Sequence, residues 1–157
     1  KLKETVEGEL LAHFKYMMFA DRAERRGMEK LASLFRALAA SEYHHARNFY
    51  SAYDRPAAFM ESIETYIPGE EFEYEHLYKT LAQYSKEHQN PLSEQAYEGA
   101  AAAEQIHAEL LKEAADVEAY EGTAVYVCPI CGYVMAGDSI PERCPVCGGP
   151  ERQYEKF

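Results

Sequence analysis

The spacing of apolar positions predicts a chain that is helical over most of its length. Apolar residues recur at steps of three and four, which places them on one face of an α-helix. Gly27 is suited to end a helix, because glycine readily adopts the left-handed conformation that follows a helix C-terminus. Asn90 and Pro91 are suited to begin one, as N-cap and first helical residue. Four helices are expected, over residues 1–27, 29–53, 70–87 and 90–120, and together they fit a four-helix bundle.

The connections between these helices favour two antiparallel hairpins. The joins within each pair are short, whereas the connection at residues 54–69 is interrupted by Pro56 and by Pro68-Gly69. This connection has room for a short helix around residues 57–63. It is also long enough either to cross a bundle or to pass the second hairpin to another subunit.

The pattern changes after Gly122. Residues 123–127 are typical of a strand, and the rest of the chain is rich in glycine, proline and cysteine. The sequence therefore predicts a helical domain at residues 1–121 and a small second domain, the tail, at residues 122–157.

The tail contains every cysteine of the chain, arranged as two Cys-x-x-Cys knuckles. Each knuckle is followed by a glycine, Gly132 or Gly148, whose positive φ lets backbone amides point at sulfur. So short a domain cannot fold on its own apolar surface, which makes a metal staple necessary. Disulfides are disfavoured because nothing in the sequence suggests an oxidising compartment. Tetrahedral zinc, as a structural ribbon, and iron, as a one-electron carrier, both fit the four thiolates. The proposed ligands are Cys128, Cys131, Cys144 and Cys147.

The charge of the chain restricts its partners. Its formal net charge is −11, and most of the excess lies before Gly122, so the chain repels phosphate backbones and nucleic acid is not an expected partner. No run of about 18 uncharged apolar residues is present, which disfavours a membrane span. The first residues carry charge and lack the apolar region of a secretory signal, so a cytoplasmic location is expected.

The predicted helices also carry the glutamate and histidine pattern of di-iron carboxylate bundles. Such bundles use a Glu from each of two helices and a Glu-x-x-His pair from each of the other two. Glu42 and His45 form one such pair on the second helix, and Glu104 and His107 form another on the fourth. The other two helices offer Glu9, Glu70 and Glu73.

A single Glu-x-x-His pair is weak evidence in a chain so rich in glutamate, and Glu73 with His76 makes a third pair. Position strengthens the interpretation, because Glu9, Glu42 and Glu104 lie within apolar stripes where unpaired charges are unfavourable. For each histidine a hydrogen-bonded core residue remains the alternative, and His76 competes with the proposed ligands. Three tyrosines can either support ligand carboxylates by hydrogen bonding or simply pack: Tyr16, Tyr78 and Tyr97.

Over essentially its whole length the chain resembles the rubrerythrins. The twelve residues between the knuckles suit a rubrerythrin tail and are fewer than in free-standing rubredoxins. The resemblance implies a mainly α fold, with a ferritin-like four-helix bundle at residues 1–121 and a rubredoxin-like domain at 122–157. The segments that carry it are Gly8-Glu9, residues 41–46, residues 68–73, residues 103–109 and the two knuckles.

The family resemblance implies a ligand set and two residues with catalytic roles. One iron would be held by His45 when reduced and by Glu73 when oxidised, and Glu73 is also our candidate proton donor. The four cysteines would hold a third iron, with zinc as the alternative. The implied di-iron ligands are Glu9, Glu42, Glu70, Glu73, Glu104 and His107, with His45 also at the site.

The activity implied by the resemblance is that of a non-haem di-iron peroxidase in oxidative-stress protection. Hydrogen peroxide would be reduced to water with electrons relayed through the rubredoxin-like iron. The external donor would be a rubredoxin or an NAD(P)H-dependent reductase. The family also implies a head-to-tail homodimer, in some members with exchanged helical hairpins. Two other functions remain open: an iron(II) oxidase or iron-handling protein, and a helical interaction protein with a zinc ribbon.

The third predicted helix departs from the family pattern. Rubrerythrins usually continue this motif with Glu-Met-Tyr-Pro, whereas residues 76–79 here are His-Leu-Tyr-Lys. An additional imidazole at His76 could compete for iron near Glu73 or alter proton delivery.

Overall fold

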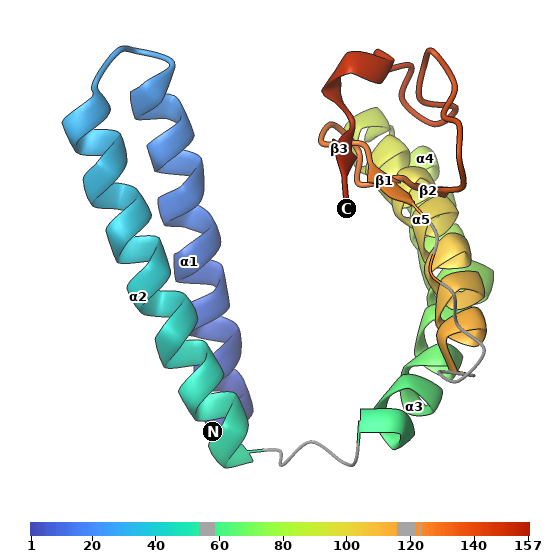
Figure 1. The fold of residues 1–157 in the computed structure, drawn as a ribbon, viewed down its shortest axis with the longest axis horizontal. Coiled ribbons are helices and arrows are strands. Elements are labelled where there is room, and N and C mark those ends of the chain that lie inside the picture. The colour runs from blue at the N-terminus through green and yellow to red at the C-terminus, as the bar shows by residue number, and fades with distance from the viewer. Residues whose placement is uncertain (54–58, 116–121, 123) are drawn as a thin grey trace. The chain divides into compact units, whose positions relative to one another are not determined.

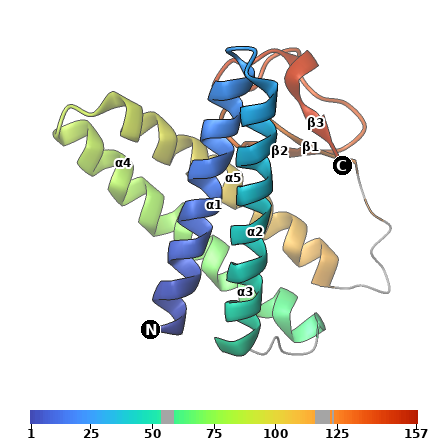
Figure 2. The same cartoon turned by 90° about the vertical axis from the view of Figure 1, so that its left-hand side faces the viewer.

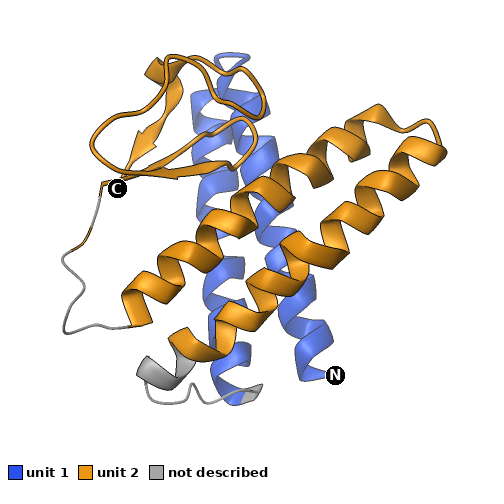
Figure 3. Ribbon diagram, turned by 90° about the vertical axis from the view of Figure 1, so that its right-hand side faces the viewer, with its two compact units in different colours: residues 1–57 blue, residues 58–157 orange. Residues whose placement is uncertain are grey.

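The computed structural model describes residues 1–53, 59–115, 122 and 124–157. The chain forms two compact units, Lys1–Ala57 and Ala58–Phe157 (Figure 3). Among the described residues, no helix is both long and apolar enough to cross a membrane.

The first unit is a helical hairpin of α1 (Leu2–Glu24) and α2 (Glu29–Tyr53) (Figure 1). Gly27 takes φ 69° in the turn, as the sequence predicts for a residue after a helix end. The ring of Phe35 packs on Tyr16 and Phe19, with centroids 6.2 and 5.5 Å apart. Small residues let the two helices approach closely, and the buried seam consists of Val6, Ala20, Ala23, Ala32, Ala39 and Ala46.

The second unit begins with a helix that is longer than the sequence predicted. α3 (Phe59–Phe72) continues through a π-helical turn, η1 (Glu73–Leu77), into α4 (Tyr78–Glu87) (Figure 2). The expected break at Pro68-Gly69, with a new helix beginning at residue 70, was wrong, because α3 runs through both residues. Pro68 removes only one backbone hydrogen bond, and the partly buried Ile63 and Ile67 give this stretch an inward face. The predicted start of the short helix, at residues 57 and 58, lies outside the described residues.

The fourth helix, α5 (Pro91–Ala115), pairs with this long helix as a second hairpin. Its N-cap is the predicted one, since Oδ1 of Asn90 accepts a hydrogen bond from the Ser93 amide at 3.2 Å. The predicted continuation over residues 116–120 lies outside the described part of the chain.

Three short strands form an antiparallel sheet in the tail, in the order β2-β1-β3. They are β1 (Val125–Val127), β2 (Val134–Ala136) and β3 (Glu155–Lys156), and a 3₁₀ turn, η2 (Glu151–Gln153), precedes β3. The predicted strand is thus present at β1, while Thr123 is outside the described residues. The predicted fold class, a mainly helical chain followed by a small cysteine domain, is confirmed.

Both helical hairpins leave large apolar side chains exposed. In the first unit these include Leu10, Leu11, Phe14, Leu34 and Leu38. In the second unit they include Tyr66, Phe72, Tyr84 and Leu92. Exposed apolar faces of this kind are typical of surfaces that bind another helix or another chain.

Candidate metal centres

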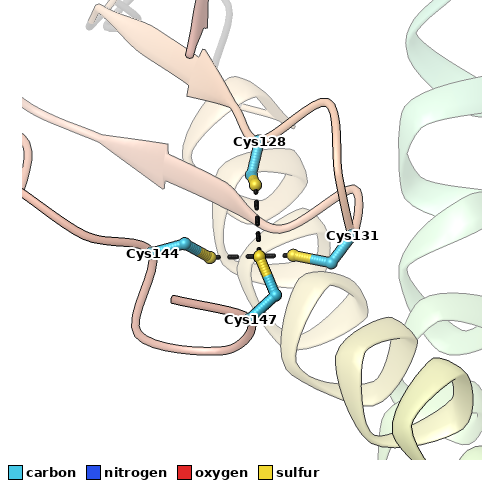
Figure 4. A group of neighbouring side chains, drawn as sticks. All are labelled: Cys128, Cys131, Cys144 and Cys147. Carbon is cyan, nitrogen blue, oxygen red and sulfur yellow. Dashed lines mark hydrogen bonds between the residues drawn. The ribbon is translucent and has the colours of Figure 1, made fainter. Parts of the chain in front are cut away.

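The two knuckles of the tail bring four free thiols to one point (Figure 4). Sγ of Cys128 lies 3.6 Å from Sγ of Cys147, and the Cys131 and Cys144 sulfurs are also 3.6 Å apart. Four sulfurs about 2.3 Å from a tetrahedral metal are separated by about 3.8 Å, so the cluster has the size of a metal site. The structure thus brings the four predicted cysteines together.

Backbone amides stabilise the thiolate form of one cysteine in this cluster. Burial alone would raise the pKa of Cys144, but the amides of Cys147 and Val146 lower it to about 6, helped by the Tyr154 hydroxyl. At Cys131, in contrast, burial dominates and raises the pKa. A low-pKa sulfur starts metal uptake as a thiolate, and a bound cation would deprotonate the others.

The first unit contains a triplet of metal-ligand side chains, formed by Glu9 of α1 with Glu42 and His45 of α2. Nδ1 of His45 lies 2.9 Å from Oε2 of Glu42 and 3.9 Å from Oε2 of Glu9. One ligand atom from each residue lies within 4.8 Å of the others. The hydrogen bond to Glu42 raises the pKa of Glu9, and burial adds to the effect. The two carboxylates therefore lie close enough to interact, as two ligands of one cation would.

The second unit repeats this arrangement with Glu70 of α3 and with Glu104 and His107 of α5. Nδ1 of His107 lies 2.5 Å from Oε2 of Glu104 and 3.4 Å from Oε2 of Glu70. Burial and the hydrogen bond to Glu70 raise the pKa of Glu104 to about 7, although His107 opposes the shift. Each triplet thus offers two carboxylates and one imidazole, a donor set that suits iron and related divalent metals.

Two orphaned oxygen atoms support this interpretation. Among the described residues, buried side-chain oxygens without a hydrogen-bond partner occur at Oε2 of Glu70 and Oη of Tyr154. One lies in a carboxylate triplet and the other beside the cysteine cluster. Buried polar atoms normally have partners, so an unpaired one at each of these two clusters fits sites built to hold a cation.

Glu73 and His76 lie on the π-helical turn and belong to neither triplet. Glu73 is close to the Tyr78 hydroxyl, whose pKa is raised first by burial and then by Glu73 and Glu104. His76 is exposed, with its ring 5.8 Å from that of Phe72. Single π-helical turns frequently occur at functional sites, and this one positions Glu73 next to a hydroxyl donor.

Sequence reasoning missed Gly99, where α5 packs on the cysteine knuckles. A Cβ placed on this buried residue would meet Cγ1 of Val146 at 3.5 Å and the carbonyl oxygen of Cys131 at 3.8 Å. Beside the contact is a cavity of about 320 Å³, which Leu92 and Ile130 help to line. The available signal was a glycine inside a long helix, which costs about 1 kcal/mol relative to alanine and usually has a packing or functional reason.

Comparison with known proteins assigns both parts of the chain. The family model described as rubrerythrin matches residues 1–115, and that described as the rubredoxin-like domain of rubrerythrin matches residues 126–155. Rubrerythrin-2 of Clostridium acetobutylicum is 28% identical, over 99% of this chain and 94% of its own. Nigerythrin of Nitratidesulfovibrio vulgaris is 30% identical, over 99% and 84%. Solved structures of nigerythrin in its mixed-valence and fully reduced, all-ferrous states match with a TM-score of 0.57, at 30% identity and the same coverage.

Proposed function

This chain belongs to the rubrerythrin family, and we propose that it reduces hydrogen peroxide to water at a di-iron centre that receives electrons from the iron of its cysteine tail. Family members are oxidoreductases that bind iron at a di-iron site and at a four-cysteine site. One observation carries the proposal. The same chain holds two Glu-Glu-His triplets and a four-thiol cluster, and α5 contributes to a triplet while contacting the cluster.

The di-iron centre of the proposal needs the ligands of both triplets. We propose that the chain forms a homodimer. In it, the two triplets of one centre come either from the same copy or, by exchange of hairpins, from both copies. The exposed apolar side chains of both hairpins support this, because each hairpin presents one half of the core that a four-helix bundle buries. Analytical ultracentrifugation of the iron-loaded protein tests the dimer, and a monomer with a full complement of iron would contradict it.

The reaction consumes two electrons and two protons, since hydrogen peroxide with both gives two molecules of water. When bound, two ferrous ions supply the electron pair that cleaves the O–O bond without release of a hydroxyl radical. The chain must supply protons, and Glu73 is our candidate for carrying one to the leaving oxygen. Its carboxylate raises the pKa of the neighbouring Tyr78 hydroxyl by charge and by hydrogen bonding. His45 offers an imidazole whose Nδ1 lies 2.9 Å from Oε2 of Glu42.

The presence of the tail favours a reductase that turns over repeatedly over an enzyme that only oxidises iron. Gly99 touches the knuckles, and Glu104 follows it on the same helix. At 1.5 Å per residue the two positions are only about 7.5 Å apart along the axis. An electron carrier so near a triplet supports repeated re-reduction of the centre, which an iron-storage function does not require.

Metal analysis followed by turnover assays tests the proposal. We expect roughly three irons per chain, two in the bundle and one in the tail. With a rubredoxin and its NAD(P)H-dependent reductase, the protein should consume peroxide continuously. Zinc in the tail would make the tail a structural domain and contradict the proposed transfer of electrons from it. Accumulation of ferric product without re-reduction would favour an iron oxidase.

A Cys144→Ala variant tests whether the tail relays electrons while the bundle reduces peroxide. It should retain the bundle irons and carry out one round of peroxide reduction when pre-reduced, but it should not turn over. Loss of the single round as well, with helical content and bundle iron unchanged, would contradict the assignment.

A further inference from the structure

The Tyr154 hydroxyl is buried beside the cysteine cluster without a hydrogen-bond partner among the described residues. Local backbone contacts fix the position of the residue. The Tyr154 amide donates to the Glu151 carbonyl at 2.9 Å, and the next residue, Glu155, pairs with Val127 directly before Cys128. The backbone of Tyr154 is therefore fixed directly before β3, the strand that pairs with β1, and β1 leads into the first knuckle.

Sulfur dominates the surroundings of this hydroxyl. Burial raises the pKa of Tyr154 most, and Cys144 raises it next, first as a hydrogen-bonding neighbour and then through its charge, ahead of the charges of Cys128 and Cys147. In the opposite direction, the hydroxyl helps to lower the pKa of Cys144. Leaving a buried hydroxyl without an acceptor is costly, and Cys144 is the group whose pKa and that of Tyr154 affect each other.

We propose that Tyr154 tunes the reduction potential of the tail iron by donating a hydrogen bond from its hydroxyl to Sγ of Cys144. The inference rests on the proposed function only in that the tail is taken to carry iron. It adds a side-chain donor to the backbone amides that already face the sulfurs.

The direction of the effect follows from charge. Reduction of an iron held by four thiolates adds one negative charge to the cluster, so a hydrogen-bond donor stabilises the reduced form more than the oxidised form. Hydrogen bonds to the sulfurs are among the factors that set such potentials. The burial of the hydroxyl strengthens the interaction, because water does not compete for the donor. Tyr154 therefore raises the potential and makes the tail easier to reduce.

The test compares Tyr154→Phe with Tyr126→Phe, a control in the same tail. Both changes remove one hydroxyl and keep the ring, and the Tyr126 ring retains its contact with Nζ of Lys156, 5.6 Å from the ring centroid. Each full-length protein is refolded anaerobically with ferrous salt, so that the metal in the tail does not depend on the cell. The potential is then measured by spectroelectrochemical titration, with the sulfur-to-iron absorption bands as a second readout.

In Tyr154→Phe the equilibrium constant for reduction of the tail iron should fall up to about tenfold, which is about 59 mV for one electron. The absorption bands should shift, while Tyr126→Phe should match the unmodified protein. An unchanged potential in Tyr154→Phe, or an equal change in both variants, would overturn the proposal. Zinc in the tail of the protein as isolated would count against the proposed function instead, because the refolded samples still report the potential.

Discussion

Nδ1 of His107 lies 3.4 Å from Oε2 of Glu70, and this contact joins α5 to α3 in the second unit. The Glu70 oxygen is buried and has no hydrogen-bond partner among the described residues. An imidazole close to an orphaned carboxylate oxygen is the arrangement expected where both bind one cation. The corresponding pair in the first unit, His45 and Glu9, is 3.9 Å apart.

Replacement of His107 by alanine should therefore weaken iron binding by at least about tenfold, since even loss of a residue that only supports a ligand has an effect of that size. The bundle should then hold about one iron fewer per chain. The measurement is iron content after dialysis against a weak chelator. His88→Ala is the matched control, because the His88 ring stacks on Tyr84 away from the triplet. Equal iron in both variants would remove His107 from the ligand set.

The raised pKa of Glu104 predicts how the metal-free protein responds to pH. Its pKa is about 7 in the folded chain and 4.5 when unperturbed, so the folded state binds more protons between these values. Stability should consequently fall as pH rises from about 5 to 8, by about 1 kcal/mol once solvent screening is allowed for. That corresponds to roughly 2–4 °C in melting temperature. Thermal denaturation of metal-free protein measures it, and Glu104→Gln should flatten the dependence.

Removal of metal from the tail should unfold it and leave the helices intact. The three-stranded sheet is too small to form a core, so the cluster has to hold the knuckles together. Trypsin should then cut at Arg143 at least about tenfold faster, since its hydrogen bond to the Gly148 carbonyl (2.9 Å) is lost. Cleavage at Arg36 on α2 serves as the internal control. Zinc should restore protection, and resistance at Arg143 without any metal would contradict the prediction.

The metal-ligand residues of both kinds of site were easier to predict from the sequence than the residues and helix that position them. Spacing identifies a Glu-x-x-His pair or a Cys-x-x-Cys knuckle because the ligands are near in sequence and their chemistry is specific. The start of α3 was missed because Pro68 carries a strong local signal for a break, whereas the inward face of Ile63 and Ile67 is a tertiary effect. Gly99 and Tyr154 act across contacts between segments distant in sequence, and their roles appear only once those segments are folded.

His76 was the main competitor among the histidines, and the structure permits a direct test of its role. Its side chain is 68% exposed and faces Phe72 and Glu75. His76→Ala should therefore leave iron content unchanged and alter peroxide turnover by no more than about twofold, as expected for a surface substitution. Loss of iron comparable to that in His107→Ala would show that His76 binds metal.

Gly99 provides the sharpest test of how the tail and α5 cooperate. Alanine at this position would make an ordinary contact, since its Cβ would lie 3.5 Å from Cγ1 of Val146. It should also stabilise the helix by up to about 1 kcal/mol. Leucine would add three further carbons at this contact, and those that do not enter the neighbouring cavity would push the knuckles away from the helix. Because electron transfer weakens steeply with distance, re-reduction of the bundle should slow in Gly99→Leu and not in Gly99→Ala.

Stopped-flow measurements can separate this effect from damage to either metal centre. The tail iron of Gly99→Leu should keep its absorption spectrum, and the pre-reduced bundle should still consume peroxide in a single round. Only the step in which electrons pass from tail to bundle should slow. If both Gly99 variants re-reduce the bundle at the rate of the unmodified protein, the contact between α5 and the knuckles is not the electron route. The tail would then have to serve the centre through another surface, such as that of a second copy in the proposed homodimer.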